Sequence, residues 1–200
     1  MSAQFPPAKT ALLLVDLQND FLHAKGAYAR GGCANADIAA LPARLNPLLD
    51  AMRERGSLTM GTLFTLVPGR AGEPIISPHL KQLRPFLTRG DFAPGSWGQQ
   101  VVDELSPLDV TIEKVAYSAF YMTRLEWVLR KLDIDHLIMG GIVTNGGVAS
   151  TVRDAHVRDI HVSVLSDGCA AFSQQVHQEA LAGMKPIADI TTIDAVLKAL

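Results

Sequence analysis

Residues 137–155 read L-I-M-G-G-I-V-T-N-G-G-V-A-S-T-V-R-D-A, and this stretch decides the fold of the chain. The apolar residues 137–139 are typical of a buried strand, which stops at two glycines. From Gly147 onward, apolar residues recur at the spacing of one helix face. Because the first turn of a helix has N–H groups without an intrahelical partner, this strand–turn–helix pattern predicts a ligand site at the sheet edge. An ordinary βα turn shows the same pattern, so the stretch alone does not decide the function.

Outward from this stretch, strand patterns alternate with helical patterns along the whole chain. Predicted strands cover residues 11–15, 57–67, 110–114, 134–139, 161–165 and 190–193. Predicted helices cover residues 37–54, capped by Asp37, and 78–87, 124–132, 147–158, 174–183 and 194–200. We therefore predict an α/β fold with Rossmann-type topology, in which a doubly wound, mostly parallel sheet of about six strands carries helices on both faces in three layers. We expect a single domain over residues 1–200.

Composition excludes several classes of partner. The 200 residues are 48% hydrophobic and carry 18 basic and 20 acidic side chains, a net charge of −2 that recommends neither nucleic acid nor a membrane surface as a partner. No apolar run reaches the roughly 18 residues of a membrane span. The first ten residues lack the pattern of a signal peptide, and the two cysteines form no C-x-x-C pair, so we expect a cytoplasmic location.

Three strand ends carry groups suited to chemistry. Asp16 follows the first predicted strand, Lys114 ends the third, and residues 142–147 follow the fourth. Parallel strands present their carboxyl ends at one edge, so an acid, an amine and backbone N–H donors are expected to converge there. A lysine beside the aspartate would hold it ionised, and a substrate that shields the pair would let the aspartate carry a proton. A plain ion pair at a loop edge is the alternative.

Four stretches of the chain resemble the isochorismatase-like (cysteine hydrolase) superfamily. They are D-L-Q-N-D-F at 16–21, E-K-V-A-Y-S-A-F at 113–120, G-G-I-V-T-N-G-G-V-A-S-T-V-R-D-A at 140–155 and L-S-D-G-C-A-A-F at 165–172. The resemblance covers nearly the whole chain. It implies a doubly wound, mostly parallel sheet, a catalytic aspartate at Asp16, a lysine at Lys114 and a cysteine nucleophile after the fourth strand.

The chain departs from this family at the nucleophile. The family pattern G-x-x-T-x-x-C-V reads G-I-V-T-N-G-G-V here, so Gly147 stands at the position of the thiol and no thioester can form there. Neither Cys33 nor Cys169 obviously replaces it. Family members carry a non-proline cis peptide that matches Ile142–Val143, and it would turn the N–H of Val143 toward the same point as that of Gly147. These two donors, with Lys114, would stabilise negative charge.

The resemblance leaves three functions open. The first is Asp-driven hydrolysis of a vinyl ether of the isochorismate type, because some enzymes of that branch have glycine in place of the cysteine. The second is a cysteine amidohydrolase for ureides or amides whose nucleophile is replaced by Gly147, naturally or by engineering. The flanking S-A-F-Y-M-T and G-I-V-T-N look more like those amidohydrolase branches, which need the thiol for C–N cleavage. The third is a non-catalytic module that binds a small molecule.

Further residues are expected around a small-molecule substrate. Aromatic side chains would suit a small planar compound. The predicted substrate-binding residues are Phe21, Trp97, Phe120, Tyr121 and Thr144. The loop arginines Arg70, Arg84 and Arg89 suit a substrate carboxylate, although a solvated arginine has the same sequence signature.

The histidines of the chain bear on whether it binds a metal ion. Zinc-dependent nicotinamidases of the superfamily use an Asp-x-His pair and further histidines after the second strand, whereas the region that follows this strand here contains only His79. We therefore expect no metal site and no cofactor. His156, His161 and His177 are expected at the surface. Family members associate as dimers or tetramers, which implies a homodimer or homotetramer here.

Overall fold

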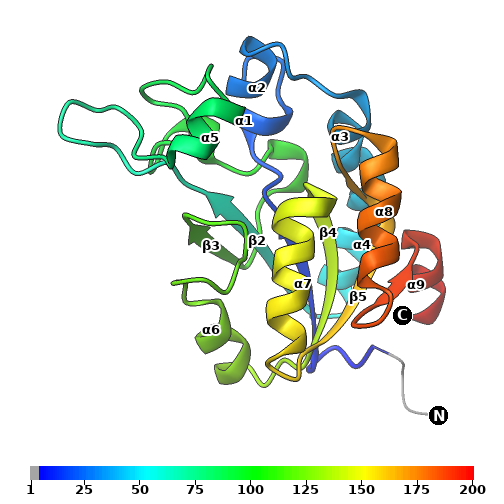
Figure 1. The fold of residues 1–200 in the computed structure, drawn as a ribbon. Coiled ribbons are helices and arrows are strands. Elements are labelled where there is room, and N and C mark those ends of the chain that lie inside the picture. The colour runs from blue at the N-terminus through cyan, green and yellow to red at the C-terminus, as the bar shows by residue number, and fades with distance from the viewer. Residues whose placement is uncertain (1–4) are drawn as a thin grey trace.

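A six-stranded, fully parallel sheet forms the centre of the computed structural model, which describes residues 5–200 (Figure 1). The strand order is β3-β2-β1-β4-β5-β6. The strands are β1 (Thr10–Val15), β2 (Leu58–Phe64), β3 (Val110–Lys114), β4 (His136–Ile142), β5 (His161–Ala170) and β6 (Asp189–Thr191). The predicted α/β fold with a doubly wound parallel sheet is confirmed.

Helices cover both faces of the sheet. The longer ones are α4 (Leu41–Glu54), α6 (Leu125–Lys131), α7 (Ala149–His156), α8 (Gln174–Met184) and α9 (Ile193–Ala199). Successive side chains of β1 point to opposite faces, as strand geometry requires. Leu13 packs in a core with α6, α7 and α8, whereas Leu12 and Leu14 pack in a second core with α4 and α9. Figure 1 shows α7 in front of the sheet and α4 behind it.

The strand order places a topological switch between β1 and β4. From β1 the chain proceeds outward to β2 and β3, and it then returns to β4 on the other side of β1. In doubly wound sheets, ligands bind in the crevice at the carboxyl ends of the two strands that flank such a switch. The segments that directly follow β1 and β4 are therefore the expected place for a site.

A small third core covers this carboxyl edge. The short helices in this layer are α1 (Asn19–Leu22), α2 (Ala27–Arg30), α5 (Pro78–Leu83) and η1 (Trp97–Gln99), whereas η2 (Asp103–Leu105) packs against α4 in the second core. Tyr28, Leu66, Leu87 and Phe92 are buried together and connect segments that are distant in the sequence. Within residues 5–200, none of the helices has the length and hydropathy that a membrane-spanning segment needs.

Several element boundaries differ from the sequence predictions. The helix predicted over residues 37–54 is divided into α3 (Ala36–Ala39) and α4, and α3 is capped by Asn35, which accepts from the N–H of Ile38, rather than by Asp37. The helix predicted from Gly147 begins with a separate π-helical turn, η3 (Thr144–Val148). The strand predicted over 161–165 extends to Ala170 because β5 resumes pairing with β4 after a register shift.

Gly141 holds β4 close to β1, and we expect its replacement by alanine to destabilise the fold. Its φ is +123°, and an added Cβ would lie 2.2 Å from the carbonyl oxygen of Val15. Backbone strain and overpacking together should cost about 2–6 kcal/mol. The control is Gly56→Ala, where φ is +71° and the added Cβ meets nothing within 4 Å. That control should cost only about 1–2 kcal/mol. Urea unfolding measures both, and equal losses would contradict the close-approach argument.

Candidate active site

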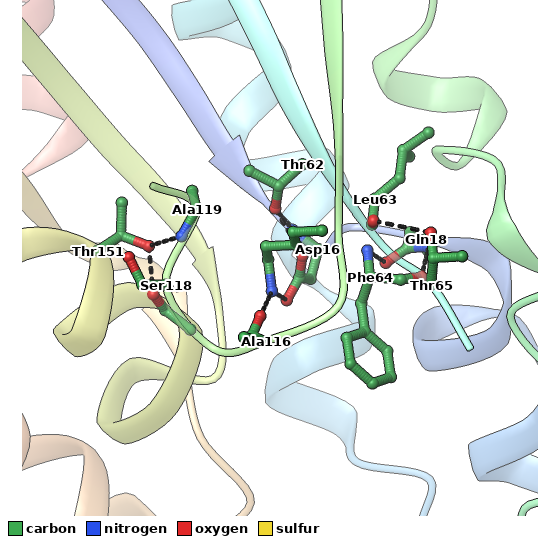
Figure 2. Close-up of polar contacts among 12 residues, drawn as sticks. Asp16, Gln18, Thr62, Leu63, Phe64, Thr65, Ala116, Ser118, Ala119 and Thr151 are labelled. Carbon is green, nitrogen blue, oxygen red and sulfur yellow. Dashed lines mark hydrogen bonds and ion pairs between the residues drawn. The ribbon is translucent and has the colours of Figure 1, made fainter. Parts of the chain in front are cut away.

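Asp16 and Lys114 form a buried ion pair at the carboxyl end of the sheet. Asp16 directly follows β1, and Lys114 is the last residue of β3. Lys114 Nζ lies 2.7 Å from Asp16 Oδ2, and the two side chains are 1% and 8% exposed. The amine also donates to the carbonyl oxygen of Ala116 at 2.9 Å (Figure 2). The structure thus brings together the acid and the amine that the strand ends predicted.

Thr62 of β2 holds the carboxylate of Asp16 from the other side. Its hydroxyl donates to Asp16 Oδ1 at 2.5 Å and accepts from the backbone N–H of Asp16 at 3.0 Å (Figure 2). Burial raises the pKa of the Asp16 carboxyl, whereas the charge and hydrogen bond of Lys114 and the hydrogen bond from Thr62 act in the opposite direction. The carboxyl is therefore fixed in orientation, and it takes up a proton more readily than an exposed aspartate.

Gly147 lies beside this carboxylate. It belongs to η3, between β4 and α7, and the preceding Ile142–Val143 peptide bond is cis. An ideal Cβ built on Gly147 would lie 3.2 Å from Asp16 Oδ2, 3.1 Å from Val15 Cγ1 and 2.9 Å from the carbonyl oxygen of Ile142. Any side chain at position 147 would therefore begin next to the acid. The position that the family pattern assigns to the nucleophile faces Asp16.

A cavity of about 280 Å³ contains these groups. Asp16, Lys114, Val143 and Gly147 all line it, together with aromatic side chains from several separate segments of the chain. The aromatic lining residues are Phe21, Tyr28, Phe64, Tyr117 and Phe172. A larger hollow of about 690 Å³ opens beside α8, but its lining includes neither Asp16 nor Lys114. The smaller cavity is the candidate active site because it alone of the two holds the paired acid and amine.

Four of the five predicted substrate-binding residues lie outside the cavity lining, and only Phe21 belongs to it. Trp97 is 50% exposed and packs edge-on against His23. Phe120 is buried in the core under α6 and α7, with the guanidinium of Arg158 over its ring. Tyr121 is 55% exposed. Their side chains turn toward the core or solvent rather than into the cavity lining, and a role for these residues in substrate binding stays a prediction.

Thr144 is the fourth of these residues, and it contacts a histidine that was wrongly expected at the surface. His177 of α8 is buried, with Nδ1 2.7 Å from Thr144 Oγ1 and Nε2 3.1 Å from the carbonyl oxygen of Ser166. Because a carbonyl oxygen only accepts, Nε2 carries the proton and the Thr144 hydroxyl donates to Nδ1 in the neutral ring. Thr144 therefore anchors η3 to α8 instead of lining the cavity. His156 and His161 are exposed, as expected.

Neither cysteine belongs to the site. Cys169 is buried, its thiol donates to the carbonyl oxygen of Met139, and burial raises its pKa to about 12. A thiol with such a pKa forms little thiolate and is a poor nucleophile. Cys33 is half-buried and lies outside the cavity lining. Among residues 5–200, no group of three His, Cys, Asp or Glu side chains is arranged to hold a metal ion.

Several positioning residues escaped the sequence analysis although they lie inside the quoted motifs. Gln18 donates to the carbonyl oxygen of Phe64 at 2.9 Å and accepts from its N–H at 2.8 Å, which fixes the end of β2. Asp20 accepts from the N–H groups of Ala27 and Phe92. Thr151 accepts from the N–H of Ala119 (Figure 2) and donates to the carbonyl oxygen of Gly147, which ties the loop after β3 to η3. The only sequence signal for the positioning roles of these three residues was that they lie inside the stretches that resemble the family.

Comparisons with known proteins agree with this fold. Residues 10–195 match the isochorismatase domain. The chain is 32% identical over 187 residues to the ureidoacrylate amidohydrolase RutB of Pantoea ananatis, and the aligned region covers 88% of this chain and 75% of that protein. It is 34% identical over 174 residues to RutB of Cronobacter sakazakii, covering 82% and 75% of the two chains. A cysteine hydrolase from Pseudomonas syringae superposes with a TM-score of 0.83 at 26% identity, covering 100% and 98%.

Replacing Lys114 with Met should destabilise the fold by about 3–5 kcal/mol at neutral pH, because it leaves the buried carboxylate of Asp16 without its partner. The loss should shrink as the pH falls. Burial already raises the pKa of Asp16, and losing the amine raises it further. A carboxyl with a raised folded pKa contributes stability at low pH, and this stability is lost as the pH rises through that pKa.

Urea unfolding at about pH 5 and about pH 8 measures this dependence. The matched control is Lys131→Met, which removes an exposed lysine from α6 and should change the free energy of unfolding by less than about 0.5 kcal/mol. A loss for Lys114→Met that is the same at both pH values would contradict the ion-pair account.

Proposed function

The chain belongs to the isochorismatase family, and we propose that it hydrolyses the C–N bond of a small amide or ureide with water as the nucleophile. The observation that carries this proposal is the position of Gly147, whose added Cβ would lie 3.2 Å from Asp16 Oδ2. A side chain is absent from the place where a nucleophile would start. A water molecule held there would lie within hydrogen-bond reach of the carboxylate.

The proposed reaction uses Asp16 first as a base and then as an acid. The oxygen of water forms a bond to the carbonyl carbon while its proton moves to the Asp16 carboxylate. The electrons of the carbonyl double bond move to oxygen, which becomes an oxyanion. The oxyanion then re-forms the carbonyl double bond as the C–N bond breaks, the electron pair of that bond stays on nitrogen, and the proton passes from Asp16 to that nitrogen. The products are an acid, or a carbamic acid in the case of a ureide, and ammonia where the nitrogen is a terminal NH2 group or an amine where it is substituted.

Lys114 and the backbone have supporting roles in this proposal. The amine, 2.7 Å from Asp16 Oδ2, keeps the buried acid ionised before the reaction although burial raises its pKa. The N–H groups of Val143 and Gly147, two residues that line the cavity, are the proposed donors to the oxyanion. Ureidoacrylate amidohydrolases among the relatives, at 32% and 34% identity, support C–N cleavage over the vinyl ether that was expected first.

Acid-catalysed hydrolysis of a vinyl ether is the second candidate, because the raised pKa of Asp16 also suits a proton donor. Protonated Asp16 would give its proton to the vinyl carbon, and water would then add to the resulting cation. The adduct would collapse to a ketone and an alcohol and return a proton to Asp16. This route needs no nucleophile at position 147.

A substrate panel tests the proposal, with 3-ureidopropionate, propionamide and isochorismate offered to the unmodified protein and to Asp16→Asn. We expect ammonia release from the ureide or the amide. Asp16→Asn should lower kcat/KM about 10²–10⁴-fold, the usual contribution of a general base. Turnover of isochorismate alone would favour the second candidate. Activity that survives Asp16→Asn would overturn both, and ligand binding without turnover would indicate a binding module.

Gly147→Cys provides a second arm of the same experiment, with Gly146→Cys as its control. A thiol at position 147 would start beside Asp16 Oδ2, whereas a Cβ at Gly146 faces Val143 and Tyr117. Gly147→Cys should change the rate of amide hydrolysis and Gly146→Cys should not create a new route. Amidase activity that appears only in Gly147→Cys would mean that the unmodified chain lacks the proposed water reaction.

The pH dependence of kcat/KM separates the two candidates. If Asp16 acts as a base, activity falls as the pH drops through its pKa, which lies above the ordinary aspartate value because of burial. If Asp16 must donate a proton in the first step, activity falls as the pH rises through the same pKa. We expect the first profile. A profile that declines steadily from acidic to neutral pH would contradict the amide proposal.

The expected homodimer or homotetramer and the expected cytoplasmic location stay predictions.

A further inference from the structure

Arg84 is a guanidinium that the fold holds in position at the cavity wall. It follows α5 and lines the cavity that contains Asp16 and Lys114. Its central carbon lies 5.6 Å from the ring centroid of Tyr28 and 5.2 Å from that of Phe172. The two rings stack on each other with centroids 5.5 Å apart and planes inclined by 10°. Arg84 Nε donates to the Tyr28 hydroxyl at 3.2 Å, and Nη1 donates to the carbonyl oxygen of Leu83.

This side chain lacks an anionic partner within residues 5–200. Its hydrogen bonds go to a phenol and a carbonyl, and Nη2 makes none with the described residues. The other strongly basic group that lines the cavity, Lys114, is neutralised by Asp16 at 2.7 Å. His79, also at the wall, is exposed. Arg84 therefore leaves positive charge uncompensated at a wall that is largely aromatic and aliphatic.

The other two loop arginines serve as a contrast. Arg70 and Arg89 are exposed and lie outside the cavity lining. Arg84 differs from both because the segment that follows α5 brings it against Tyr28 from α2 and Phe172 from the end of β5. Three segments distant in the sequence thus fix one guanidinium. A flexible side chain would lose more entropy on binding than one that is already held.

We propose that Arg84 binds a carboxylate of the substrate, so that the substrate class is a small acid with its hydrolysable amide or ureide at the other end. This inference rests on the proposed function for the reacting end only. A planar guanidinium donates two parallel hydrogen bonds to a carboxylate, which gives both affinity and orientation. Phe21 and Phe64 line the same cavity and would contact the carbon chain between the two ends. A cavity of about 280 Å³ suits a compound of this size.

Binding of unreactive ligands tests the proposal without turnover. The probes are 4-oxopentanoate and its neutral counterpart 5-hydroxypentan-2-one, which contain no C–N bond and therefore cannot undergo the proposed reaction. NMR titration measures the Kd of each for the unmodified protein, Arg84→Gln, Arg84→Lys and Arg89→Gln. We expect the unmodified protein to bind the acid about 10–100-fold more tightly than the alcohol, the range of a charge-assisted hydrogen-bonded pair.

The variants should separate a specific contact from general charge. Arg84→Gln should remove the preference for the acid and leave the Kd of the alcohol unchanged. Arg84→Lys should keep only part of the preference for the acid, because lysine retains the positive charge but lacks the planar guanidinium that donates two parallel hydrogen bonds. Arg89→Gln should bind both compounds like the unmodified protein. Equal affinity for the two compounds, failure of both to bind at millimolar concentration, or equal losses in Arg84→Gln and Arg89→Gln would overturn the proposal.

The same measurements distinguish this inference from the function on which it rests. If the acid binds through Arg84 but no ureide or amide is hydrolysed, the anion site stands and the proposed reaction fails. If 3-ureidopropionate is hydrolysed with the same KM by the unmodified protein and Arg84→Gln, the reaction stands and the role of Arg84 fails.

Discussion

The buried ion pair between Asp16 and Lys114 is the interaction on which the rest of this site depends. Removing two charges from water costs several kcal/mol for each ion, and a pair persists only where its remaining donors and acceptors are satisfied. Thr62 and the carbonyl oxygen of Ala116 meet that need, and the parallel sheet sets β1, β2 and β3 side by side so that all four groups meet. Apolar residues of similar volume would often be no less stable at such a position. We therefore interpret the pair as a feature retained for chemistry.

Gly147 removes the thiol that the family pattern places beside this ion pair. A structural neighbour of this chain is described as a cysteine hydrolase, a name that refers to a thiol nucleophile. This chain has the same fold, but at position 147 a glycine faces the carboxylate of Asp16. A thiol needs the aspartate only to remove its proton. In the proposed reaction, which has no thiol, the same carboxylate acts on water, so its fixed orientation and raised pKa become more important. Thr62 supplies the first and burial supplies the second.

The sequence was sufficient to predict the sheet and the meeting of the acid with the amine, because the carboxyl ends of parallel strands share one edge whatever their side chains are. It did not predict the walls of the cavity. Tyr28, Phe64 and Phe172 reach the cavity from three separate segments, and their directions depend on contacts such as those of Asp20 with Ala27 and Phe92. Trp97, Phe120 and Tyr121 lie near the site in sequence but turn elsewhere. The burial of His177 follows from its bond to Thr144, a pairing between residues that local periodicity cannot reveal.

The most direct test of the central claim is a crystal structure of the Asp16→Asn variant with unreacted 3-ureidopropionate. The account predicts that the scissile carbonyl oxygen lies about 3 Å from the backbone nitrogens of Val143 and Gly147. It also predicts that the carbonyl carbon faces the side chain at position 16, with room between them for one water molecule. A ligand bound in this cavity with its carbonyl turned away from position 16, or bound only elsewhere on the protein, would contradict the account.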